Sequence, residues 1–533
     1  MWQPESFERS LPTYHTSPVT DGRSTKLIDI FAGPGGLGEG FASVEDTGGR
    51  RFEIALSIEK EVWAHRTLWL RSWFRHAKAQ GNAATYYAYV RGGISISELR
   101  GSCHAASERA DEEAWNIELG PETHREVTAR VRAALDADAD ANWVLIGGPP
   151  CQAYSLVGRS RMRGSNPERF EADKRHFLYR EYLRILAEHA PPAFVMENVK
   201  GVLSSKIGGE SIFERILSDL QHPALALDLD RTFQPRYRLF SVSAPLNDQR
   251  QLFAQRQDFV VRCEDYGVPQ ARHRVIIFGL RADIFGDDYC PLYLEPVPKM
   301  SLQTVLADLP PMRSGISQND SDGEWDRTII QFMTKMAVAQ DIGPDVAAVA
   351  QEALATFAAG RGRGGRFTPG NPSVLYRNGW FLDADLGGFL NHETRGHISE
   401  DLERYLFAAC FGKARKRSPS LDDFPDRLLP DHANVEAGPG RIFNDRFRVQ
   451  LSGQPSTTIT SHISKDGHYY IHPDPGQCRS LTVREAARLQ TFPDNYFFEG
   501  PRTSQYVQVG NAVPPILAAQ VARIVRDALD RRA

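Results

Sequence analysis

The chain has 533 residues, of which 41% are hydrophobic and 24% are charged, a balance typical of a soluble globular protein. No run of roughly 18 apolar residues occurs and the start lacks the basic and apolar segments of a signal peptide, so we expect no membrane contact and a cytoplasmic location. The net charge of −4 neither predicts nor excludes DNA binding, because a basic cleft can exist within a balanced total.

Length and cysteine usage narrow the class further. The chain is too long for one ordinary hydrophobic core, and we expect two or three domains. The six cysteines are scattered without a C-x-x-C pair. This spacing favours neither a disulfide framework nor a zinc cluster, and we expect no bound metal.

Residues 1–281 alternate short apolar segments with amphipathic ones. Segments 61–74 and 178–189 place Trp, Leu and Ile at helical spacing. Strands are predicted at 26–31, 52–58, 143–146, 193–196, 237–242 and 275–280. This alternation predicts an α/β fold with a doubly wound, mostly parallel sheet of the Rossmann-like type. The stretches 76–141 and 244–260 interrupt the pattern and are predicted to be surface insertions.

The alternation fails over residues 282–474, where Pro, Gly and Arg become frequent, and a second, irregular domain is expected there. Regular structure resumes in residues 475–533, where Thr482 and Glu485 have the spacing of a capping box. A closing helix is predicted within "PPILAAQVARIVRDAL", residues 514–529, with Pro515 in its first turn. Its apolar stripe consists of Leu517, Val521, Ile524, Val525 and Ala528.

The stretch "DIFAGPGGLGEGF", residues 29–41, directly follows the first predicted strand. Gly33, Gly35 and Gly38 fit the G-x-G-x-x-G fingerprint of a dinucleotide-binding turn, and Glu59 lies where a ribose-binding carboxylate is expected. The motif indicates a nucleotide-type cofactor but no reaction, and a dehydrogenase is compatible with it.

Cys151 follows a second predicted strand in "NWVLIGGPPCQAYSLVGR", residues 142–159. Two glycines and two prolines bring it to the tip of a loop at the carboxyl end of the sheet, where open α/β sheets bind ligands. A buried, inert cysteine is the alternative, and the polar surroundings argue against it.

Two further strands end in polar residues. Glu197 and Asn198 end one of them, and a partly desolvated carboxyl tends to hold a proton. Gln270, Arg272 and Arg274 occupy alternate positions at the entrance to the other, so they point the same way. The alternatives are a loop-bracing Glu-Asn pair and a solvated strand entrance.

These four stretches, followed by "RSLTVREAARLQTFPD" (479–494) and "YVQVGNAVPP" (506–515), together resemble the C5-cytosine DNA methyltransferase family in motif content and order. The resemblance covers roughly residues 26–281 and 450–530. It implies a methyltransferase that converts S-adenosyl-L-methionine to S-adenosyl-L-homocysteine and acts as a monomer on double-stranded DNA with a flipped-out cytosine. Expected partners are restriction or phage-defence proteins, and DNA binding implies association with the nucleoid.

In the chemistry that the resemblance implies, Cys151 adds to carbon 6 of cytosine, Glu197 binds or protonates N3, and Arg272 and Arg274 hold the base. The residues that the resemblance assigns to cofactor binding are Phe31, Gly33, Pro34, Gly35, Gly36, Glu59, Pro150, Leu178, Asn511 and Val513. An acid that contacts the adenine amine is expected at the end of the third strand. We expect that position near Gly93, where no acid is present.

The resemblance also divides the chain into a catalytic domain (1–281), a target-recognition domain (282–474) and a C-terminal segment that returns to the catalytic domain (475–533). Basic and polar residues are predicted to contact DNA phosphates or bases. They are Gln152, Ser155, Arg159, Arg161, Arg163, Asn198, Gln270, Arg361, Arg363 and Arg366.

Other functions fit the sequence less well. A dehydrogenase gives no role to Cys151, Glu197 or the strand-entrance arginines, and a zinc nucleobase deaminase needs an H-x-E with P-C-x-x-C motif that is missing. An RNA (tRNA) cytosine-5 methyltransferase of the same family remains the alternative, although its recognition segment is typically much smaller. The prediction is therefore a DNA (cytosine-5-)-methyltransferase that marks a short sequence in restriction–modification or phage defence.

Overall fold

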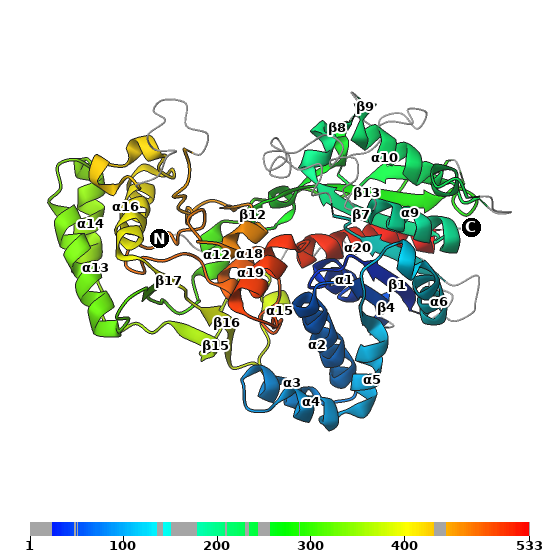
Figure 1. Ribbon diagram of the computed structural model, residues 1–533, viewed down its shortest axis with the longest axis horizontal. Helices are drawn as coiled ribbons and strands as arrows, with labels where there is room; N and C mark the ends of the chain where they lie inside the picture. The colour runs from blue at the N-terminus through cyan, green and yellow to red at the C-terminus, as the bar shows by residue number, and fades with distance from the viewer. Residues whose placement is uncertain are drawn as a thin grey trace.

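The computed structural model describes residues 24–46, 49–50, 52–135, 142–150, 178–207, 210–229, 234–243, 256–286, 288–430 and 444–531. Within these residues the central sheet has eight strands, and it is mostly parallel (Figure 1). In order across the sheet they are β10 (Tyr237–Ser241), β13 (His273–Arg281), β7 (Ala193–Val199), β6 (Trp143–Gly147), β1 (Thr25–Ile30), β4 (Phe52–Glu59) and β5 (Ala114–Asn116), with β11 (Val260–Arg262) also paired to β13.

The direction of the strands confirms the predicted fold class. The pairs β7–β6, β6–β1, β1–β4 and β4–β5 are parallel, whereas β13 runs antiparallel to β7, β10 and β11. All six predicted strands are present, with bounds shifted by up to three residues. Their continuous apolar runs are typical of strands that are covered on both faces.

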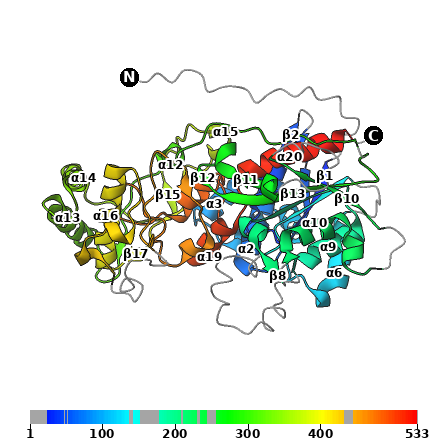
Figure 2. The same cartoon turned by 90° about the horizontal axis from the view of Figure 1, so that it is seen from above.

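Alternating side chains of the strands enter two separate hydrophobic cores. Leu27 and Val144 lie in the core on one face, and Ile28 and Leu145 lie in the core on the other. The helices α1 (Gly36–Ala42) and α20 (Pro515–Asp530) cover the first face. The second face is covered by α6 (His124–Ala134), α9 (Leu178–His189) and α10 (Ile212–Gln221), with the short α11 (Pro223–Ala226) beside them (Figure 2).

The apolar stripe predicted for the last helix is buried as expected. It packs so closely on α1 that a methyl group added at Gly40 would lie 2.4 Å from the Pro515 carbonyl oxygen. Only a glycine at this position allows the two helices to approach this closely.

The prediction of a surface insertion over 76–141 is wrong for part of that stretch. It contains β5, whose Ala114 pairs in parallel with Ser57 of β4 and extends the sheet. Gly93, by contrast, lies after a helix, so the third strand of the fold is 114–116 and does not lie near Gly93. Three residues without an apolar run carry no strand signal, which explains the error. Similarly, β11 begins at Val260, the last residue of the second predicted insertion.

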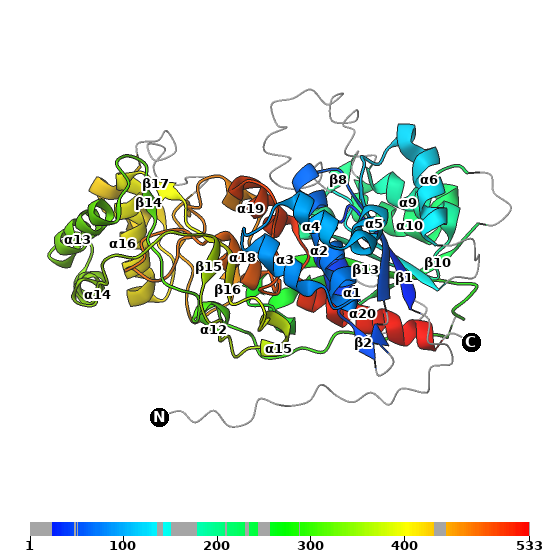
Figure 3. The ribbon, with the colours of Figure 1, turned by 90° about the horizontal axis from the view of Figure 1, so that it is seen from below.

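Helices at the end of the sheet near β4 and β5 form a third hydrophobic core, together with side chains from the later part of the chain. These helices are α2 (Val62–Ala79), α3 (Ala83–Val90), α4 (Ile96–Ser102) and α5 (His104–Glu113). Figure 3 shows α3 beside the hairpin of β15 (Gly364–Pro369) and β16 (Gly388–Glu393). Hydrogen bonds join the two, because Arg366 of β15 donates to the backbone carbonyls of Tyr89 and Val90 in α3.

A second region lies at the far end of the molecule from the sheet (Figure 1). Alternation of strands and helices stops there, as predicted, but three helices that the composition does not indicate form a core of their own. They are α13 (Asp322–Ala337), α14 (Pro344–Ala355) and α16 (Ser399–Arg415). Trp325, Phe407 and Tyr405 are completely buried between them.

Between the sheet and this helical region lies a further core, built from segments distant in the sequence. Its helices are α12 (Leu302–Leu306), α15 (Asn378–Phe381), α18 (Val483–Leu489) and α19 (Arg502–Asn511). The predicted capping box of Thr482 and Glu485 is confirmed at the start of α18. The short strands outside the sheet are β2 (Glu45–Asp46), β3 (Gly49–Arg50), β8 (Lys206–Ile207), β9 (Glu210–Ser211), β12 (Gln270–Ala271), β14 (Gly315–Ile316), β17 (Gly396–His397) and β18 (Ser456–Thr457).

Among the helices in the described parts of the chain, none is long and apolar enough to cross a membrane.

Candidate active site

The turn after β1 has an unusual backbone. Phe31, Gly33 and Gly35 all have positive φ angles, of 56°, 58° and 88°. Phenylalanine rarely adopts this conformation, whereas glycine adopts it freely. The turn leads straight into α1, so its backbone N–H groups and the start of the helix lie at the carboxyl edge of the sheet, where a ligand with negative or polar groups is favoured.

Glu59 at the end of β4 closes this turn. Its Oε2 accepts a hydrogen bond from the Gly33 N–H at 2.9 Å, and its Oε1 accepts one from the Glu61 N–H at 2.8 Å. Burial raises the pKa of Glu59, and these backbone donors partly offset that rise. A methyl group added at Gly33 would meet no atom of the described residues within 4 Å, so the described part of the chain leaves space for a ligand beside the carboxylate.

The end of the chain forms another wall of the turn. A methyl group at Gly36 would lie 2.3 Å from the Val513 carbonyl oxygen, which shows how closely residues 511–513 approach the start of α1. The hydroxyl of Tyr496 donates a hydrogen bond to the Pro34 carbonyl. Asn511 is exposed and Val513 is buried beside the turn. The structure thus brings together the predicted cofactor residues of the two ends of the chain.

Glu197 and Arg274 form an ion pair at the same edge of the sheet. The Arg274 Nε lies 2.8 Å from the Glu197 Oε1, and the side chains are 11% and 13% exposed. The antiparallel pairing of β7 with β13 places Ile276 opposite Glu197 and Arg274 opposite Val199. The pair is nearly buried, and it occupies the Oε1 oxygen of the Glu197 carboxylate.

The loop after β6 lies directly against this pair. A methyl group at Gly148 would approach Glu197 Oε2 to 2.8 Å. Asn198 Nδ2 donates to the Pro149 carbonyl at 3.3 Å, and Asn198 Oδ1 accepts from the Val199 N–H at 2.8 Å. Asn198 is thus buried and anchors the residues that lead to Cys151.

Cys151, Gln152, Ser155, Arg159, Arg161 and Arg163 lie outside the described residues. Pro150, the last described residue before them, is half-buried next to Pro149, and Leu178, the first described residue after them, begins α9. The roles of these residues stay predictions from the sequence.

Gln270 and Arg274 do not lie on one strand as the alternation predicts, because β12 leaves the central sheet and pairs with β18, whereas Arg274 belongs to β13. Arg272 is 1% exposed and donates to the carbonyls of Ile459 at 2.6 Å and Gly510 at 3.1 Å. Burial, followed by the charge of Arg274, lowers the pKa of Arg272 to about 9. Gln270 is fully buried and bonds within the protein, with Gln490 at 2.9 Å, a placement at odds with the predicted DNA contact.

The three arginines of the segment 360–366 also bond within the protein. Arg361 donates to the Gly476 carbonyl at 2.5 Å, and Arg363 pairs with Asp320 at 2.9 Å. Arg366 donates to the carbonyls of Tyr89 and Val90, each at 3.1 Å. Their predicted contacts with DNA stay predictions.

Other described cysteines are poor nucleophile candidates. Cys263 lies near Glu197 and Arg274, but its side chain is completely buried and burial raises its pKa to about 12. Burial likewise raises the pKa of Cys410 to about 12 and that of Cys478 well above its usual value. Because the thiolate is the nucleophile, these groups are unreactive.

Two features of the site were missed by the sequence reasoning. Asp29, on β1 beneath the glycine turn, is 1% exposed, and burial followed by the charge of Glu59 raises the pKa of its carboxyl well above its ordinary range. Asn116, at the end of β5, donates to the Glu59 carbonyl at 2.8 Å. The letter D in "DIFAGPGG" was the available signal for Asp29, since a carboxylate inside a strand buried on both faces is costly.

Comparison with known proteins decides the family. A family model described as C-5 cytosine-specific DNA methylase matches residues 102–223 and 390–526. The type II methyltransferase M.Bpa9945I of Bacillus paralicheniformis is 33% identical over 522 residues, which make up 95% of this chain and 99% of that protein. The chain belongs to the C-5 cytosine-specific DNA methylase family. The resemblance predicted from the motifs is therefore confirmed.

More distant relatives of the family extend over most of the chain. The type II methyltransferase M.DdeI of Desulfomicrobium norvegicum is 24% identical over 93% of this chain and 87% of that protein. The DNA (cytosine-5-)-methyltransferase M.ApeKI of Aeropyrum pernix is 27% identical over 75% of this chain and 83% of that protein. The two matched segments of the C-5 cytosine-specific DNA methylase model contain Glu197 and Asn511 but leave residues 224–389 between them unmatched.

Proposed function

We propose that this protein is an S-adenosyl-L-methionine-dependent DNA (cytosine-5-)-methyltransferase of the type II restriction–modification type. The family to which the chain belongs carries this proposal. The Glu197–Arg274 pair beside the loop that leads to Cys151 supplies the local support, since it puts an acid and a cation within reach of a base bound at that loop.

The residues of the glycine turn fit S-adenosyl-L-methionine. Glu59 lies beside open space at the carboxyl edge of the sheet, where its carboxylate would bind the ribose hydroxyls. Phe31 would pack near the adenine, and Gly33, Pro34, Gly35 and Gly36 would accommodate the methionine part. The remaining residues proposed to line the cofactor are Pro150, Leu178, Asn511 and Val513. When bound, the cofactor supplies an electrophilic methyl group.

Carbon 5 of cytosine is a poor nucleophile, so the ring must be activated by covalent addition. The Cys151 thiolate would form a bond to carbon 6, while Glu197 holds or delivers a proton at N3 to accept the electron density. Carbon 5 would attack the methyl group of the bound cofactor, with S-adenosyl-L-homocysteine as the leaving group. Loss of the carbon 5 proton to solvent would then re-form the C5–C6 double bond, expel the Cys151 thiolate and restore the aromatic ring, while Glu197 takes back the N3 proton.

Arg274 would hold the Glu197 carboxylate in position and contact the base. Arg272 keeps one buried donor, its Nε, without a hydrogen-bond partner in the described structure, so a contact with the base is still available to it. Its other donors would fix the strand entrance against residues 459 and 510. We therefore assign Arg272 a positioning role as well as the base contact inferred from the family.

The target is double-stranded DNA, whose cytosine must leave the helix to reach Cys151. We propose residues 1–281 as the catalytic domain, 282–474 as the target-recognition domain and 475–533 as the segment that returns to the catalytic domain. Protein partners would be a cognate nuclease or phage-defence protein, and the enzyme would work as a monomer on the nucleoid in the cytoplasm.

The test is bisulfite sequencing of DNA from cells that express the wild type, Cys151→Ser or Cys290→Ser. The exposed Cys290 provides the matched control. We expect 5-methylcytosine in one short sequence context with the wild type and Cys290→Ser, and none with Cys151→Ser. Absence of site-specific 5-methylcytosine with the wild type, or equal methylation by Cys151→Ser, would overturn the proposal. Methyl transfer to tRNA alone would identify the RNA-modifying alternative.

A further inference from the structure

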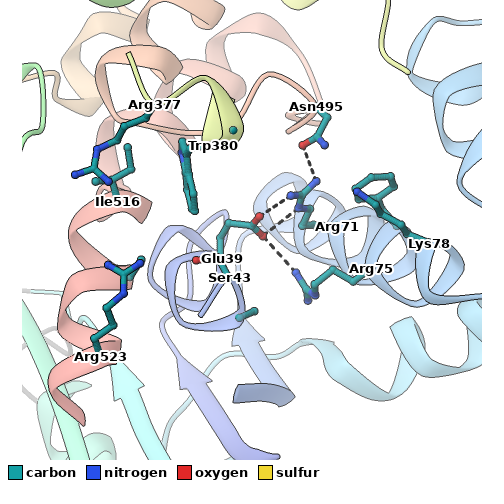
Figure 4. A pocket seen from close by; sticks show the side chains of 14 residues that line it. Glu39, Ser43, Arg71, Arg75, Lys78, Arg377, Trp380, Asn495, Ile516 and Arg523 are labelled. Carbon is teal, nitrogen blue, oxygen red and sulfur yellow. Dashed lines mark hydrogen bonds and ion pairs between the residues drawn. The ribbon is translucent and has the colours of Figure 1, made fainter. Parts of the chain in front are cut away.

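A polar cavity of about 330 Å³ lies between α1, α2, α15 and α20, and neither Glu197 nor Arg274 lines it. Figure 4 shows basic side chains that enter it from three of these segments. The charged residues that line the cavity are Glu39, Arg71, Arg75, Lys78, Arg377 and Arg523. Glu39 is the only carboxylate among the lining residues that the structure describes, so cations predominate.

Arg71 and Arg75 already neutralise that carboxylate. Arg71 binds Glu39 with two nitrogens, Nη2 to Oε1 at 2.5 Å and Nε to Oε2 at 3.0 Å. Arg75 lies 3.5 Å from Glu39 and also pairs with Glu113. Glu39 is 7% exposed. Its charge is therefore balanced by Arg71 and Arg75.

Arg377 and Arg523 have no ion pair within the described structure. Arg377 bonds through its Nε to the Tyr376 hydroxyl at 3.0 Å, and its side chain lines the cavity. Both side chains are half-buried, and Figure 4 shows them on the same side of Glu39. Burial first, and then repulsion from Arg377 and Arg526, lowers the pKa of Arg523. Two cations held near one another without a counter-charge repel.

Trp380 adds a flat aromatic wall beside these arginines. Its indole Nε1 donates to the Thr491 carbonyl at 2.8 Å, which fixes the ring, and the half-buried side chain lines the cavity. A planar guanidinium fork fits the oxygens of a phosphate group, and an aromatic ring fits a nucleobase. A cavity of this volume is within the usual range for small-molecule sites.

We propose that this cavity is a second ligand site, in which Arg377 and Arg523 bind the phosphate group of a small molecule, either inorganic phosphate or a mononucleotide stacked on Trp380. The site is separate from the methylation site and does not depend on the proposed function. A connection to the cofactor turn exists: Arg71 donates to Asn495 at 3.0 Å, and the next residue, Tyr496, binds the Pro34 carbonyl.

The test measures binding on the full-length protein without DNA or cofactor. Isothermal titration calorimetry with sodium phosphate and with adenosine monophosphate, in a chloride buffer of constant ionic strength, would compare the wild type with Arg523→Gln and Arg377→Gln. The exposed Arg327, which pairs with its helix neighbour Glu324, gives the matched control Arg327→Gln. We expect saturable binding that is about tenfold or more weaker in both cavity variants and unchanged in the control.

Thermal unfolding distinguishes a ligand site from a structural role. In a low-salt chloride buffer Arg523→Gln should unfold at the same temperature as the wild type or a higher one, because the substitution removes repulsion. In saturating phosphate, Arg523→Gln should unfold at a lower temperature than the wild type. A loss of stability in both buffers would assign Arg523 a structural role and overturn the proposal.

Further outcomes would also overturn the proposal. The first is the absence of saturable binding of both phosphate and adenosine monophosphate. Another is equal weakening in Arg327→Gln, which indicates a general salt effect. A third is weaker DNA binding by Arg523→Gln with no binding of the small anions, which would make the cavity part of a DNA-binding surface. Binding of phosphate alone, without tighter binding of the mononucleotide, would support the arginine site and identify inorganic phosphate as its ligand.

Discussion

The sequence predicts functional residues both at the carboxyl edge of the sheet and in the arginine-rich segment 360–366. In the structure the side chains of these two regions have different surroundings. At the sheet edge, Glu197, Arg274 and Glu59 lie beside open space or beside the loop to Cys151. In the segment 360–366, by contrast, the arginines bind carbonyls and carboxylates of their own protein. Position at the end of a buried strand therefore indicates a site more reliably than a concentration of charge does.

The physical reason is the number of donors on an arginine. A guanidinium has five N–H groups, and folded proteins leave many carbonyls near the surface that can accept them. Arg366 shows this use: it donates to two carbonyls of α3 and lies over the rings of Tyr89 and Phe497, at 4.8 and 4.4 Å from their centroids. The strand-end acids also have partners in the protein, Arg274 for Glu197 and two backbone N–H groups for Glu59, but they lie at the edge of the sheet where a ligand can reach them.

The largest expected effect comes from Glu197→Gln. Loss of the acid that acts at N3 should lower kcat by about 10²-fold to 10⁴-fold, and the folded structure should survive because glutamine has the same shape. Methyl transfer to duplex DNA in vitro is the measurement. The matched control is Glu118→Gln, which removes an exposed pair with Lys60 and should leave kcat unchanged. A wild-type rate for Glu197→Gln would show that the reaction does not need this acid at the sheet edge.

Gly148→Ala tests the geometry of the same edge. The added methyl group would lie 2.8 Å from Glu197 Oε2, so the carboxylate must move, and a displacement of this size should lower kcat by about 10-fold to 100-fold. Gly323→Ala, in α13, is the control, because a methyl group there meets nothing within 4 Å. If kcat of Gly148→Ala stays at the control value, the position of Glu197 does not limit the reaction.

Asp29→Asn probes the buried acid beneath the cofactor turn through the pH dependence of stability. The folded-state pKa of Asp29 is raised, so its protonated form is favoured on folding. The resulting contribution to the stability of the wild type is complete below the unfolded-state pKa of about 3.9. As the pH rises above that value, the wild type loses stability relative to Asp29→Asn. Urea unfolding at a series of pH values measures the difference.

Asp385→Asn supplies the control for this series, because Asp385 is exposed and its substitution should produce no such trend. A constant difference in stability between wild type and Asp29→Asn across the acid and neutral range would show that Asp29 folds with its usual charge.

The smallest effect is expected from Arg366→Gln. Loss of its carbonyl bonds and ring contacts should lower the free energy of unfolding by about 1 kcal/mol, since the side chain is exposed. Affinity for DNA should not change. Urea unfolding and a DNA-binding titration measure the two properties. The control variant is Arg109→Gln, at an exposed residue paired with Glu112. Weaker DNA binding at unchanged stability would show that Arg366 contacts DNA, as the sequence predicts.

Much of the sheet could be predicted, because apolar runs bounded by turn residues define strands locally. The predicted strand 193–196 and the polar residues that follow it are an example. β5 could not be predicted, since Ala114–Asn116 has too few residues for a pattern and is held in the sheet by β4. The helices of the second region were missed because the Pro, Gly and Arg that become frequent over residues 282–474 lie between the helices.

The sequence by itself determined the family, the order of the motifs and the polar residues at the strand ends, because each of these depends on residues that are close together in the chain. Only the tertiary structure decided which polar residues remain available. Arg272 and Gly510 are 238 positions apart, yet they share a hydrogen bond that uses one of the donors of this predicted base-binding residue. Hydrogen-bond partners that come from distant segments cannot be read from local pattern, because the packing of the whole chain selects them.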